Sequence, residues 1–340
     1  MPASRVGSVQ RPVALRETSP PAVVPLSPAP LMADKDDGGM TAWPPDARQA
    51  QPLVVSRFAP SPTGRLHLGH ACSAMHAHDL ARAAGGRFLL RIEDIDPGRC
   101  REEFVAGIME DLAWLGLCWD GPVVRQSARM PRYAQALERL EADGLVYPCF
   151  CTRADIAREI AASAAAPHGP EGVPYPGTCR ALLPAERAAR RAREPHALRL
   201  DMARAIGRVG ALHFLDVGAG RVAVDAAPFG DVVLARKDAP VAYHLAVVVD
   251  DAAQGVTDVV RGVDLFAATH VHRVLQALLG LPAPVYHHHP LILDAGGRRL
   301  AKRDRAATLA DLRARGDDPR ALLESLRAGQ LPIGFETRLA

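Results

Sequence analysis

Strand-like and helix-like segments alternate along the first part of the chain that reads as ordered, and this alternation constrains the fold more than any other feature. The four segments are residues 53–58, 70–84, 87–92 and 102–115. The first and third read as short apolar strands, and the second and fourth read as helices. Strand, helix, strand, helix is typical of a parallel sheet in an α/β fold. Ligands of such sheets bind beyond the carboxyl ends of the strands, where the loop 59–69 and Glu93 are expected to lie.

The composition excludes several other classes of protein. The chain of 340 residues is 48% hydrophobic and 23% charged, which is ordinary for a globular protein and excludes wholesale disorder or a coiled coil. Its length predicts two lobes, or one domain with insertions. No apolar run approaches the ~18 residues of a membrane helix, so we expect no membrane partner. The net charge of +3 says little about nucleic acid, because the distribution of charge decides such binding.

The loop after the first strand has the composition of a phosphate-binding turn. Together with the last two residues of the strand and the first residue of the helix, it reads Arg57-Phe58-Ala59-Pro60-Ser61-Pro62-Thr63-Gly64-Arg65-Leu66-His67-Leu68-Gly69-His70. Gly69 allows the backbone to approach a nucleotide closely, and the helix expected from His70 directs its amide dipole at phosphate. His67 and His70 can donate hydrogen bonds to phosphoryl oxygens as charge develops on them.

This segment resembles the class I aminoacyl-tRNA synthetases, and within them the glutamyl branch. His67-Leu68-Gly69-His70 matches the HIGH signature of the class, and residues 57–64 match the lead-in of the glutamyl branch. The resemblance covers about residues 53–310 and implies a Rossmann-type parallel-sheet catalytic domain that uses ATP and Mg²⁺. It implies that His67, Gly69 and His70 bind ATP, and that the two histidines are catalytic.

The same resemblance implies a glutamate site. In the family, the Glu of the segment 91–96 meets the substrate amino group, which implies Glu93, and the two aspartates of that segment are left as scaffold. A planar guanidinium pairs a carboxylate bidentately, so Arg57 and Arg261 would offer two cations to a substrate with two carboxylates. The glutamate-binding residues expected in this way are Arg57, Phe58, Ala59, Pro60, Ser61, Glu93, Tyr243 and Arg261.

A basic loop, residues 298–303, lies where the class carries its KMSKS loop. The match is degraded, because Arg299 and Ala301 replace a lysine and a serine of that motif. Lys302 is retained, and the resemblance implies that it is the third catalytic residue and binds the ATP phosphates.

Three cysteines are spaced like metal ligands. Cys149 and Cys151 in a C-x-C arrangement, with Cys179 further on, suggest a tetrahedral Zn²⁺ site that needs one more ligand. The glutamyl-queuosine tRNA(Asp) synthetases have a similar pattern, C-x-C followed by Y-x3-C, which implies Tyr175 as the fourth ligand. His168 is the alternative ligand, and a site that has lost its metal is the other alternative. Six cysteines in all are too sparse for a disulfide scaffold, which favours a reducing, cytoplasmic setting.

The second half of the chain contains further predicted elements and a run of histidines. Residues 231–234 and 241–249 read as strands, and residues 265–279 read as a helix. The run 287–289 is His-His-His, but consecutive side chains of a strand point to opposite faces and cannot converge on one ion. We therefore expect these histidines to be structural or near the nucleotide.

The motifs and the composition together divide the chain into five parts. These are a disordered Pro/Ala-rich tail (1–52), the first half of the Rossmann catalytic domain (53–148), a zinc-binding and basic insertion (149–200), the second half of the catalytic domain (201–295), and a KMSKS-like loop with a C-terminal helical remnant (296–340).

Two departures from the tRNA-charging enzymes predict the acceptor. Only 38 residues follow Lys302, too few for an anticodon-binding domain, and residues 261–265 read R-G-V-D-L in place of R-G-E-D-H. These departures imply the paralogue that attaches glutamate to the queuosine base of tRNA(Asp), a monomer whose partners are glutamate, ATP and the queuosine-containing anticodon stem-loop. The alternatives are a truncated glutamyl-tRNA synthetase that charges a 3′ end and an inactive RNA-binding paralogue.

Overall fold

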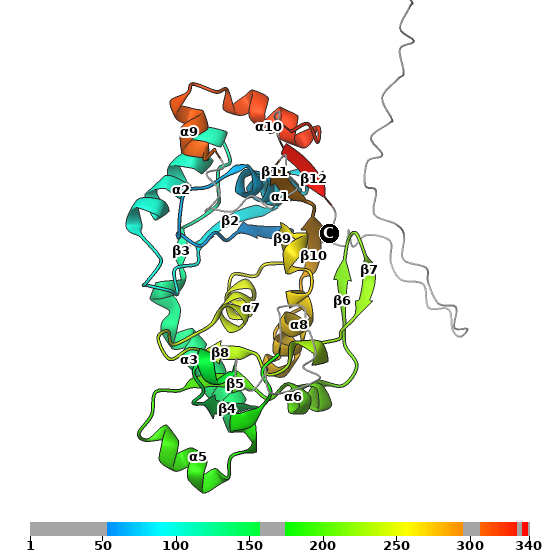
Figure 1. The fold of residues 1–340 in the computed structure, drawn as a ribbon. Coiled ribbons are helices and arrows are strands. Elements are labelled where there is room, and N and C mark those ends of the chain that lie inside the picture. Colours follow the sequence, from blue (N-terminus) through cyan, green and yellow to red (C-terminus); the bar gives the residue numbers. More distant parts are fainter. Residues whose placement is uncertain (1–52, 157–173, 295–306, 332–334, 339–340) are drawn as a thin grey trace, which may run out of the picture. The chain divides into compact units, whose positions relative to one another are not determined.

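Three parallel strands form the first sheet of the computed structural model, which describes residues 53–156, 174–294, 307–331 and 335–338 (Figure 1). Their order is β1-β2-β3, and the bounds are β1 Val55–Phe58, β2 Arg87–Ile92 and β3 Val124–Arg125. Helix α1 (Leu68–Ala83) connects β1 to β2, and helix α2 (Glu102–Leu115) lies between β2 and β3. The predicted parallel α/β pattern is therefore confirmed. The predicted tail 1–52, His168 and Lys302 lie outside the described residues.

A second sheet continues the first on the other side of β1. Its order is β7-β6-β10-β9, with β9 Asp258–Gly262, β10 Val285–His289, β6 His213–Asp216 and β7 Gly220–Ala223. Strand β10 runs parallel to both β9 and β6. The backbone N–H of Thr257 donates to the carbonyl of Val55 at 2.9 Å, which places β9 beside β1. The strand order therefore reverses between β1 and β9, and the crevice at such a point is where α/β sheets bind ligands.

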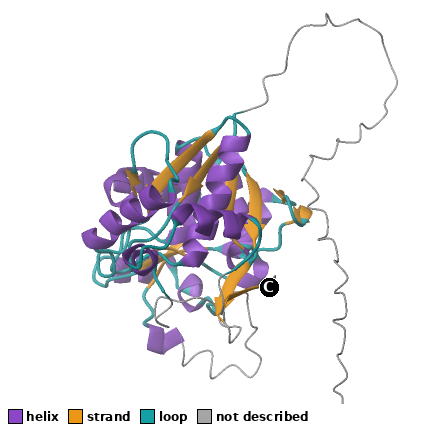
Figure 2. Ribbon diagram, turned by 90° about the horizontal axis from the view of Figure 1, so that it is seen from above, coloured by secondary structure: helices purple, strands orange, loops and turns teal. Residues whose placement is uncertain are grey.

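Alternation along β1 and β2 directs side chains to two different helical layers. Phe88, Leu90 and Ile92 pack in one core with α1 and α2. The alternate residues Arg57 and Arg91 point to the opposite face, where helix α7 (Tyr243–Ala253) presents carboxylates. Helices thus cover both faces of the sheet, as seen from above in Figure 2. A strand that is covered on both faces carries few exposed residues, so Arg57 and Arg91 are buried as well.

Helix α7 corrects one prediction, because the segment 241–249 was expected to be a strand. The run Leu245 to Val248 is apolar and fully buried, with neighbours on every side. Periodicity cannot distinguish a buried helix from a buried strand in such a run. Helix α1 also begins at Leu68 rather than at His70, because His67 already caps it.

The remaining elements form a second lobe and a carboxyl-terminal cover. An antiparallel sheet of order β4-β5-β8 flanks the predicted insertion, with β4 Val146–Cys149, β5 Ala197–Leu200 and β8 Val233–Ala235. The helices around it are α3 Met130–Ala142, α5 Pro184–Arg191, α6 Met202–Val209 and α8 Ala268–Leu279. The carboxyl-terminal elements are β11 Leu291–Asp294, α9 Leu309–Ala314, α10 Pro319–Arg327 and β12 Phe335–Arg338. None of the described helices is long and apolar enough to cross a bilayer.

Candidate functional site

The start of α1 fixes the two signature histidines by backbone hydrogen bonds. The Nδ1 atom of His67 accepts from the backbone N–H of Gly69 at 3.1 Å, and the Nδ1 atom of His70 accepts from that of His67 at 3.2 Å. The two rings lie against each other, with their centroids 3.8 Å apart. Because both Nδ1 atoms are acceptors, the hydrogen of each neutral ring must be on Nε2. The arrangement therefore makes both rings hydrogen-bond donors at a helix N-terminus, a place that favours phosphate.

The predicted glutamate- and ATP-binding residues come together in one cavity of about 440 Å³, here called the first cavity. All of them that the structure describes line it: Arg57, Phe58, Ala59, Pro60, Ser61, His67, Gly69, His70, Glu93, Tyr243 and Arg261. The cavity lies beyond the carboxyl ends of β1, β2 and β9, as expected for this class of sheet. Lys302 lies outside the described residues.

Arg57 already has an anionic partner within the protein. It is 4% exposed, and its Nε donates to Oδ1 of Asp251 at 3.0 Å while Nη1 donates to the carbonyl of Val260 at 3.3 Å. Arg91, which is fully buried, donates to the same Asp251 at 2.7 Å and to Glu93 at 3.1 Å. Asp251 thus holds two guanidinium groups side by side beneath the first cavity, and the charge of Arg57 is matched without any substrate.

Arg261 has a different environment. It is 5% exposed, and its three nitrogens donate to neutral groups: Nε to His288 at 3.1 Å, Nη1 to His272 at 3.2 Å and Nη2 to Thr269 at 2.6 Å. Its guanidinium also lies 5.2 Å from the ring centre of Tyr286. Among the residues that the structure describes, no carboxylate forms an ion pair with it. A buried cation without an anion is costly, so this arrangement favours an anionic ligand in the first cavity.

Glu93 lines the same cavity. Its backbone N–H donates to the carbonyl of Pro60 at 3.0 Å, which joins the signature loop to the end of β2. Burial raises the pKa of Glu93, and the attraction of Arg91 and Arg57 only partly opposes this effect. An ammonium group of a ligand would restore the charged form, so the carboxylate is placed to receive a primary amine.

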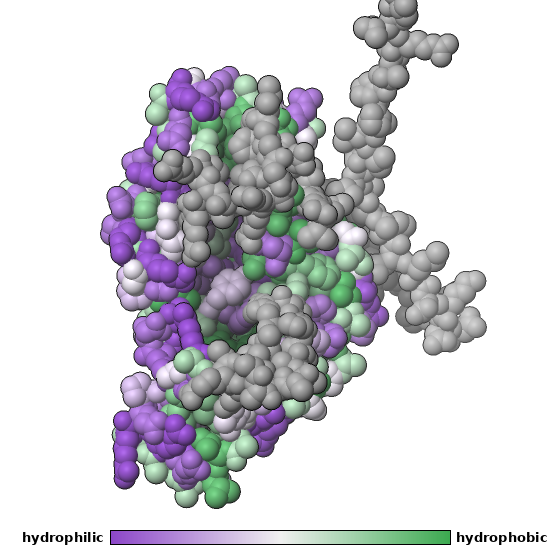
Figure 3. Space-filling model, viewed as in Figure 1, coloured by the Kyte–Doolittle hydropathy of each residue, from purple (hydrophilic) through white to green (hydrophobic). Residues whose placement is uncertain are grey.

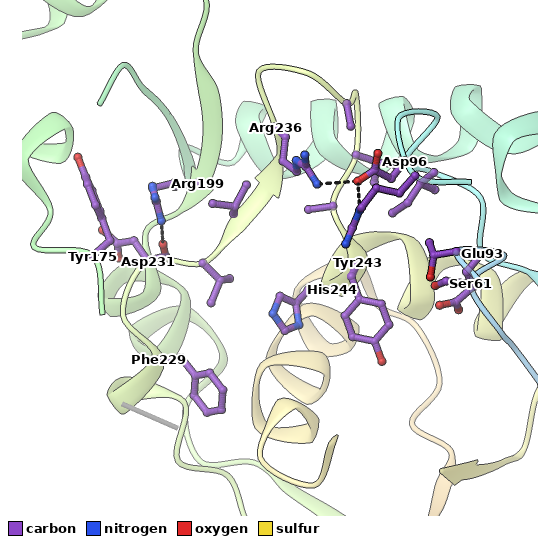
Figure 4. Close-up of a pocket in the computed structure, with 18 of the residues that line it drawn as sticks. Ser61, Glu93, Asp96, Tyr175, Arg199, Phe229, Asp231, Arg236, Tyr243 and His244 are labelled. Carbon is purple, nitrogen blue, oxygen red and sulfur yellow. Dashed lines mark hydrogen bonds and ion pairs between the residues drawn. The ribbon is translucent and has the colours of Figure 1, made fainter. Parts of the chain in front are cut away.

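A second cavity of about 520 Å³ adjoins the first and shares Ser61, Glu93 and Tyr243 with it. Figure 4 shows charged side chains around it, including Asp96, Arg199 and Arg236. The Oδ2 atom of Asp96 accepts from Arg99 at 2.8 Å and from Arg236 at 3.3 Å. The space-filling view shows a hollow in the middle of this face with hydrophilic side chains at its margin (Figure 3). The two cavities together can hold two reactants side by side.

The cysteine cluster lies next to the second cavity. The Sγ atoms of Cys149, Cys151 and Cys179 are all within 4.8 Å of one another. The hydroxyl of Tyr175 is 3.3 Å from Sγ of Cys151 and accepts from the backbone N–H of Cys179 at 2.9 Å. The guanidinium of Arg199 lies 4.0 Å from the ring centre of Tyr175, and both of these side chains line the second cavity.

Sequence reasoning missed several residues of the first cavity. They include Ser73, Gly262, Asp264 and Leu265. His289, which was expected to be structural or near the nucleotide, also lines this cavity, because it ends β10 at the edge where the ligands of a parallel sheet bind. The expectation that the three consecutive histidines do not share one ion is confirmed, because they contact Asp258, Asp216 and Ser73 respectively.

The segment 180–199 belongs to the predicted basic insertion, and three of its six arginines form ion pairs within the protein. Arg180 pairs with Asp231 at 3.0 Å, Arg190 pairs with Glu194 at 2.9 Å, and Arg191 pairs with Glu141. Cys118 is exposed, although a single cysteine in an apolar stretch is usually a small buried residue.

Comparison with known proteins places this geometry in context. Residues 53–334 match the family described as tRNA synthetases class I (E and Q), catalytic domain. The chain is 54% identical over 276 residues to a protein of Rhodobacter capsulatus named glutamyl-Q tRNA(Asp) synthetase, which covers 78% of this chain and 97% of the relative. A protein of the same name from Nocardia farcinica is 52% identical over 274 residues, which cover 80% of this chain and 83% of the relative.

The fold is also similar to solved structures. A glutamate tRNA ligase from Elizabethkingia meningosepticum, solved in complex with its amino acid, superposes with a TM-score of 0.67 at 28% identity. The match covers 81% of this chain and 60% of that chain. A glutamate-tRNA synthetase from Elizabethkingia anophelis gives a TM-score of 0.68 at 28% identity and covers 80% and 61% of the two chains. The chain therefore spans about three fifths of these solved proteins.

Proposed function

The chain belongs to the catalytic-domain family of class I tRNA synthetases (E and Q), and we propose that it activates glutamate with ATP and transfers the glutamyl group to the queuosine base in the anticodon loop of tRNA(Asp). One observation carries the proposal. The relative that matches over 97% of its own length, at 54% identity, is named glutamyl-Q tRNA(Asp) synthetase. The enzyme is thus a ligase that releases AMP and pyrophosphate.

The charge pattern of the first cavity supports glutamate as the amino acid. The uncompensated Arg261 suits the side-chain carboxylate, because a guanidinium holds a carboxylate through two parallel hydrogen bonds. Glu93, which lines the same cavity, suits the ammonium group. Arg57 lines the same cavity, but Asp251 already matches its charge, so we assign to it a share in shaping the site rather than the main carboxylate contact.

Adenylate formation needs no nucleophile from the enzyme. The α-carboxylate of glutamate attacks the α-phosphorus of ATP, and pyrophosphate leaves in line with it. His67 and His70 would donate their Nε2 hydrogens to phosphate oxygens as charge develops, which is a contribution of positioning and electrostatics. Lys302 is assigned to the same phosphates from its place in the sequence alone. Mg²⁺ bound to ATP would supply neutralisation of the phosphate charge.

The second cavity suits the acceptor. Its volume of about 520 Å³ lies in the range of small-ligand pockets, and it opens directly beside the shared wall of Ser61, Glu93 and Tyr243. Bases of an anticodon loop are unpaired and can be splayed into a pocket, which a duplex does not allow. A queuosine inserted here would bring a ring hydroxyl next to the glutamyl-adenylate, and that hydroxyl would displace AMP.

The acceptor is tested directly with RNA. We expect ATP–pyrophosphate exchange that depends on glutamate and needs no tRNA. We also expect glutamate to be transferred to an isolated tRNA(Asp) anticodon stem-loop carrying queuosine, and not to the same stem-loop carrying guanosine. The measurement is acid-precipitable radiolabelled glutamate on each RNA. Stable transfer to the 3′-terminal ribose of tRNA(Glu) would instead identify an enzyme that charges tRNA ends.

The cysteine cluster fits a structural Zn²⁺ ion by its chemistry and spacing. Ligands at ~2.3 Å in a tetrahedron lie about 3.8 Å apart, which matches three thiols within 4.8 Å of one another. Cys149, Cys151 and Cys179 would hold the ion, and Tyr175 is the described residue placed to complete the set. The ion would cross-link the segment that carries Tyr175, and through it the wall of the second cavity.

Replacing Cys151 with serine should remove zinc and slow transfer to the acceptor, while glutamate activation largely survives. The reason is that Tyr175 lines the second cavity and not the first. The measurements are metal content of purified protein, pyrophosphate exchange and transfer to the queuosine stem-loop. Cys118→Ser is the matched control, because Cys118 is exposed and lies outside the cluster. Wild-type protein purified without zinc, or full transfer by a zinc-free Cys151→Ser protein, would contradict the assignment.

A further inference from the structure

A row of hydrogen-bonded side chains passes through Arg261, which lines the first cavity, and reaches the wall of the second cavity. On one side, Nε of Arg261 donates to Nε2 of His288, whose Nδ1 lies 2.6 Å from a carboxylate oxygen of Asp216. On the other side, Nη1 of Arg261 lies 3.2 Å from Nδ1 of His272, and Nε2 of His272 lies 3.1 Å from Nδ1 of His244. His244 is part of the wall of the second cavity.

Arg261 determines which atom donates in every hydrogen bond of this row of side chains. A guanidinium carries five N–H donors and no acceptor, so the ring nitrogens that face it must be unprotonated. The hydrogen of His272 is therefore on Nε2 and is donated to His244, while the hydrogen of His288 is on Nδ1 and is donated to Asp216. Both rings must be neutral to play this part.

The number of N–H groups also shows which donors of Arg261 remain for a ligand. Three of its N–H groups are used by His288, His272 and Thr269, one from each nitrogen. One N–H is left on each terminal nitrogen, which is the number that a bidentate carboxylate requires. The partners of Arg261 therefore hold its plane in place and leave its charge unmatched.

We propose that His272 is a specificity-determining positioning residue, because as a neutral acceptor it orients Arg261 without neutralising it and so reserves that cation for an anionic substrate side chain. A carboxylate in the same place would orient Arg261 equally well but would match its charge, as Asp251 does for Arg57. The inference rests on the proposed activation of glutamate and adds the residue that favours glutamate over its neutral amide, glutamine.

Burial supports the neutral state that this role demands. His272 is 2% exposed, and burial together with the positive charge of Arg261 lowers its pKa well below the usual range. The same two influences lower the pKa of His288 to about 4, against the opposing attraction of Asp216. Neither ring gains a proton near neutral pH, so the acceptors that face Arg261 are preserved.

The test compares two variants of nearly equal size and different charge. His272→Gln keeps a neutral acceptor for Arg261 and a donor for His244, whereas His272→Glu introduces a carboxylate. In glutamate-dependent pyrophosphate exchange, we expect His272→Gln to keep the KM for glutamate within about three-fold of wild type. We expect His272→Glu to raise that KM by roughly ten-fold to a hundred-fold, the range for one hydrogen-bonded charge. The kcat should change much less, because this contact acts on ground state and transition state alike.

Matched controls come from the same helix. His270 lies two residues before His272, and its Nδ1 accepts from the backbone N–H of Asp225 rather than from Arg261. His270→Gln and His270→Glu should leave the KM for glutamate and the preference over glutamine unchanged. Thermal unfolding of each variant shows that the kinetic values come from folded protein.

The outcomes separate this inference from the proposed function. A wild-type protein without glutamate-dependent exchange would overturn both. Wild-type exchange with the same KM in His272→Glu would overturn only the role of His272, and so would equal losses in His272→Gln and His272→Glu. A loss in kcat with an unchanged KM would also overturn it, because positioning of a substrate-binding arginine acts on binding.

Discussion

Replacing Arg261 with lysine should raise the KM for glutamate by roughly 30-fold to several thousand-fold, corresponding to the ~2–5 kcal/mol lost when one partner of a buried, hydrogen-bonded charge pair is removed. Lysine keeps the charge but cannot present two parallel N–H groups to a carboxylate. It also cannot donate to His288, His272 and Thr269 at once from three fixed positions. We therefore expect the preference for glutamate over glutamine to collapse in pyrophosphate exchange.

Arg273→Lys is the matched control for this change. Arg273 lies on α8 and donates from Nε to the backbone carbonyl of His213, away from the first cavity. The Arg273→Lys variant should have the same KM for glutamate as the wild-type protein. Arg261 would be reduced to a structural residue if its lysine variant discriminated glutamate from glutamine as well as the wild-type protein does.

Replacing Asp251 with asparagine should lower the free energy of unfolding by about 3–5 kcal/mol, the cost of leaving a buried charge without its partner. Asp251 is 6% exposed and accepts from both Arg57 and Arg91. Among the described residues, this loss would leave Arg57 without an ion pair and Arg91 with Glu93 and Asp250. Urea denaturation followed by circular dichroism measures the change. Asp238→Asn, which removes an exposed partner of Arg236, should not move the midpoint measurably.

The pH dependence of stability provides a second readout for Asp251. Burial raises its pKa, but the attraction of Arg57 and Arg91 outweighs burial and holds the pKa below its ordinary value. A carboxyl whose folded pKa is depressed contributes stability that is present above the unfolded pKa of about 3.9 and is lost as pH falls through the folded value. The difference between wild type and Asp251→Asn should therefore stay constant from pH 8 to about pH 5 and shrink in stronger acid. A difference that grew in acid would contradict this origin.

The sequence by itself determined the elements whose signals are local. The alternation of strands and helices through β1, α1, β2 and α2 follows from short-range pattern, and α2 occupies the predicted residues 102–115. The signature loop could be predicted because its fourteen residues are contiguous. Its hydrogen bonds involve the local backbone and neighbouring side chains. The N-terminal cap of α1 is an example, since His67, Gly69 and His70 form hydrogen bonds with one another within a single turn.

Tertiary structure alone decided the state of α7, because a fully apolar run has no face that periodicity can reveal. The segment 241–249 became a helix when it packed against the sheet, and this placed Asp251 beneath Arg57, 194 residues away in the chain. Without that contact the sequence presented Arg57 and Arg261 as equivalent cations.

The distinction between the two arginines is therefore a property of the fold. The charge of Arg57 is matched by a carboxylate from α7, whereas Arg261 is surrounded by neutral acceptors from α8 and β10. The energy of a buried charge depends on the groups that surround it, and those groups come from segments far apart in the sequence. The sequence pointed to both arginines of the first cavity, and packing of the helices against the sheet decided which cation is left for a substrate.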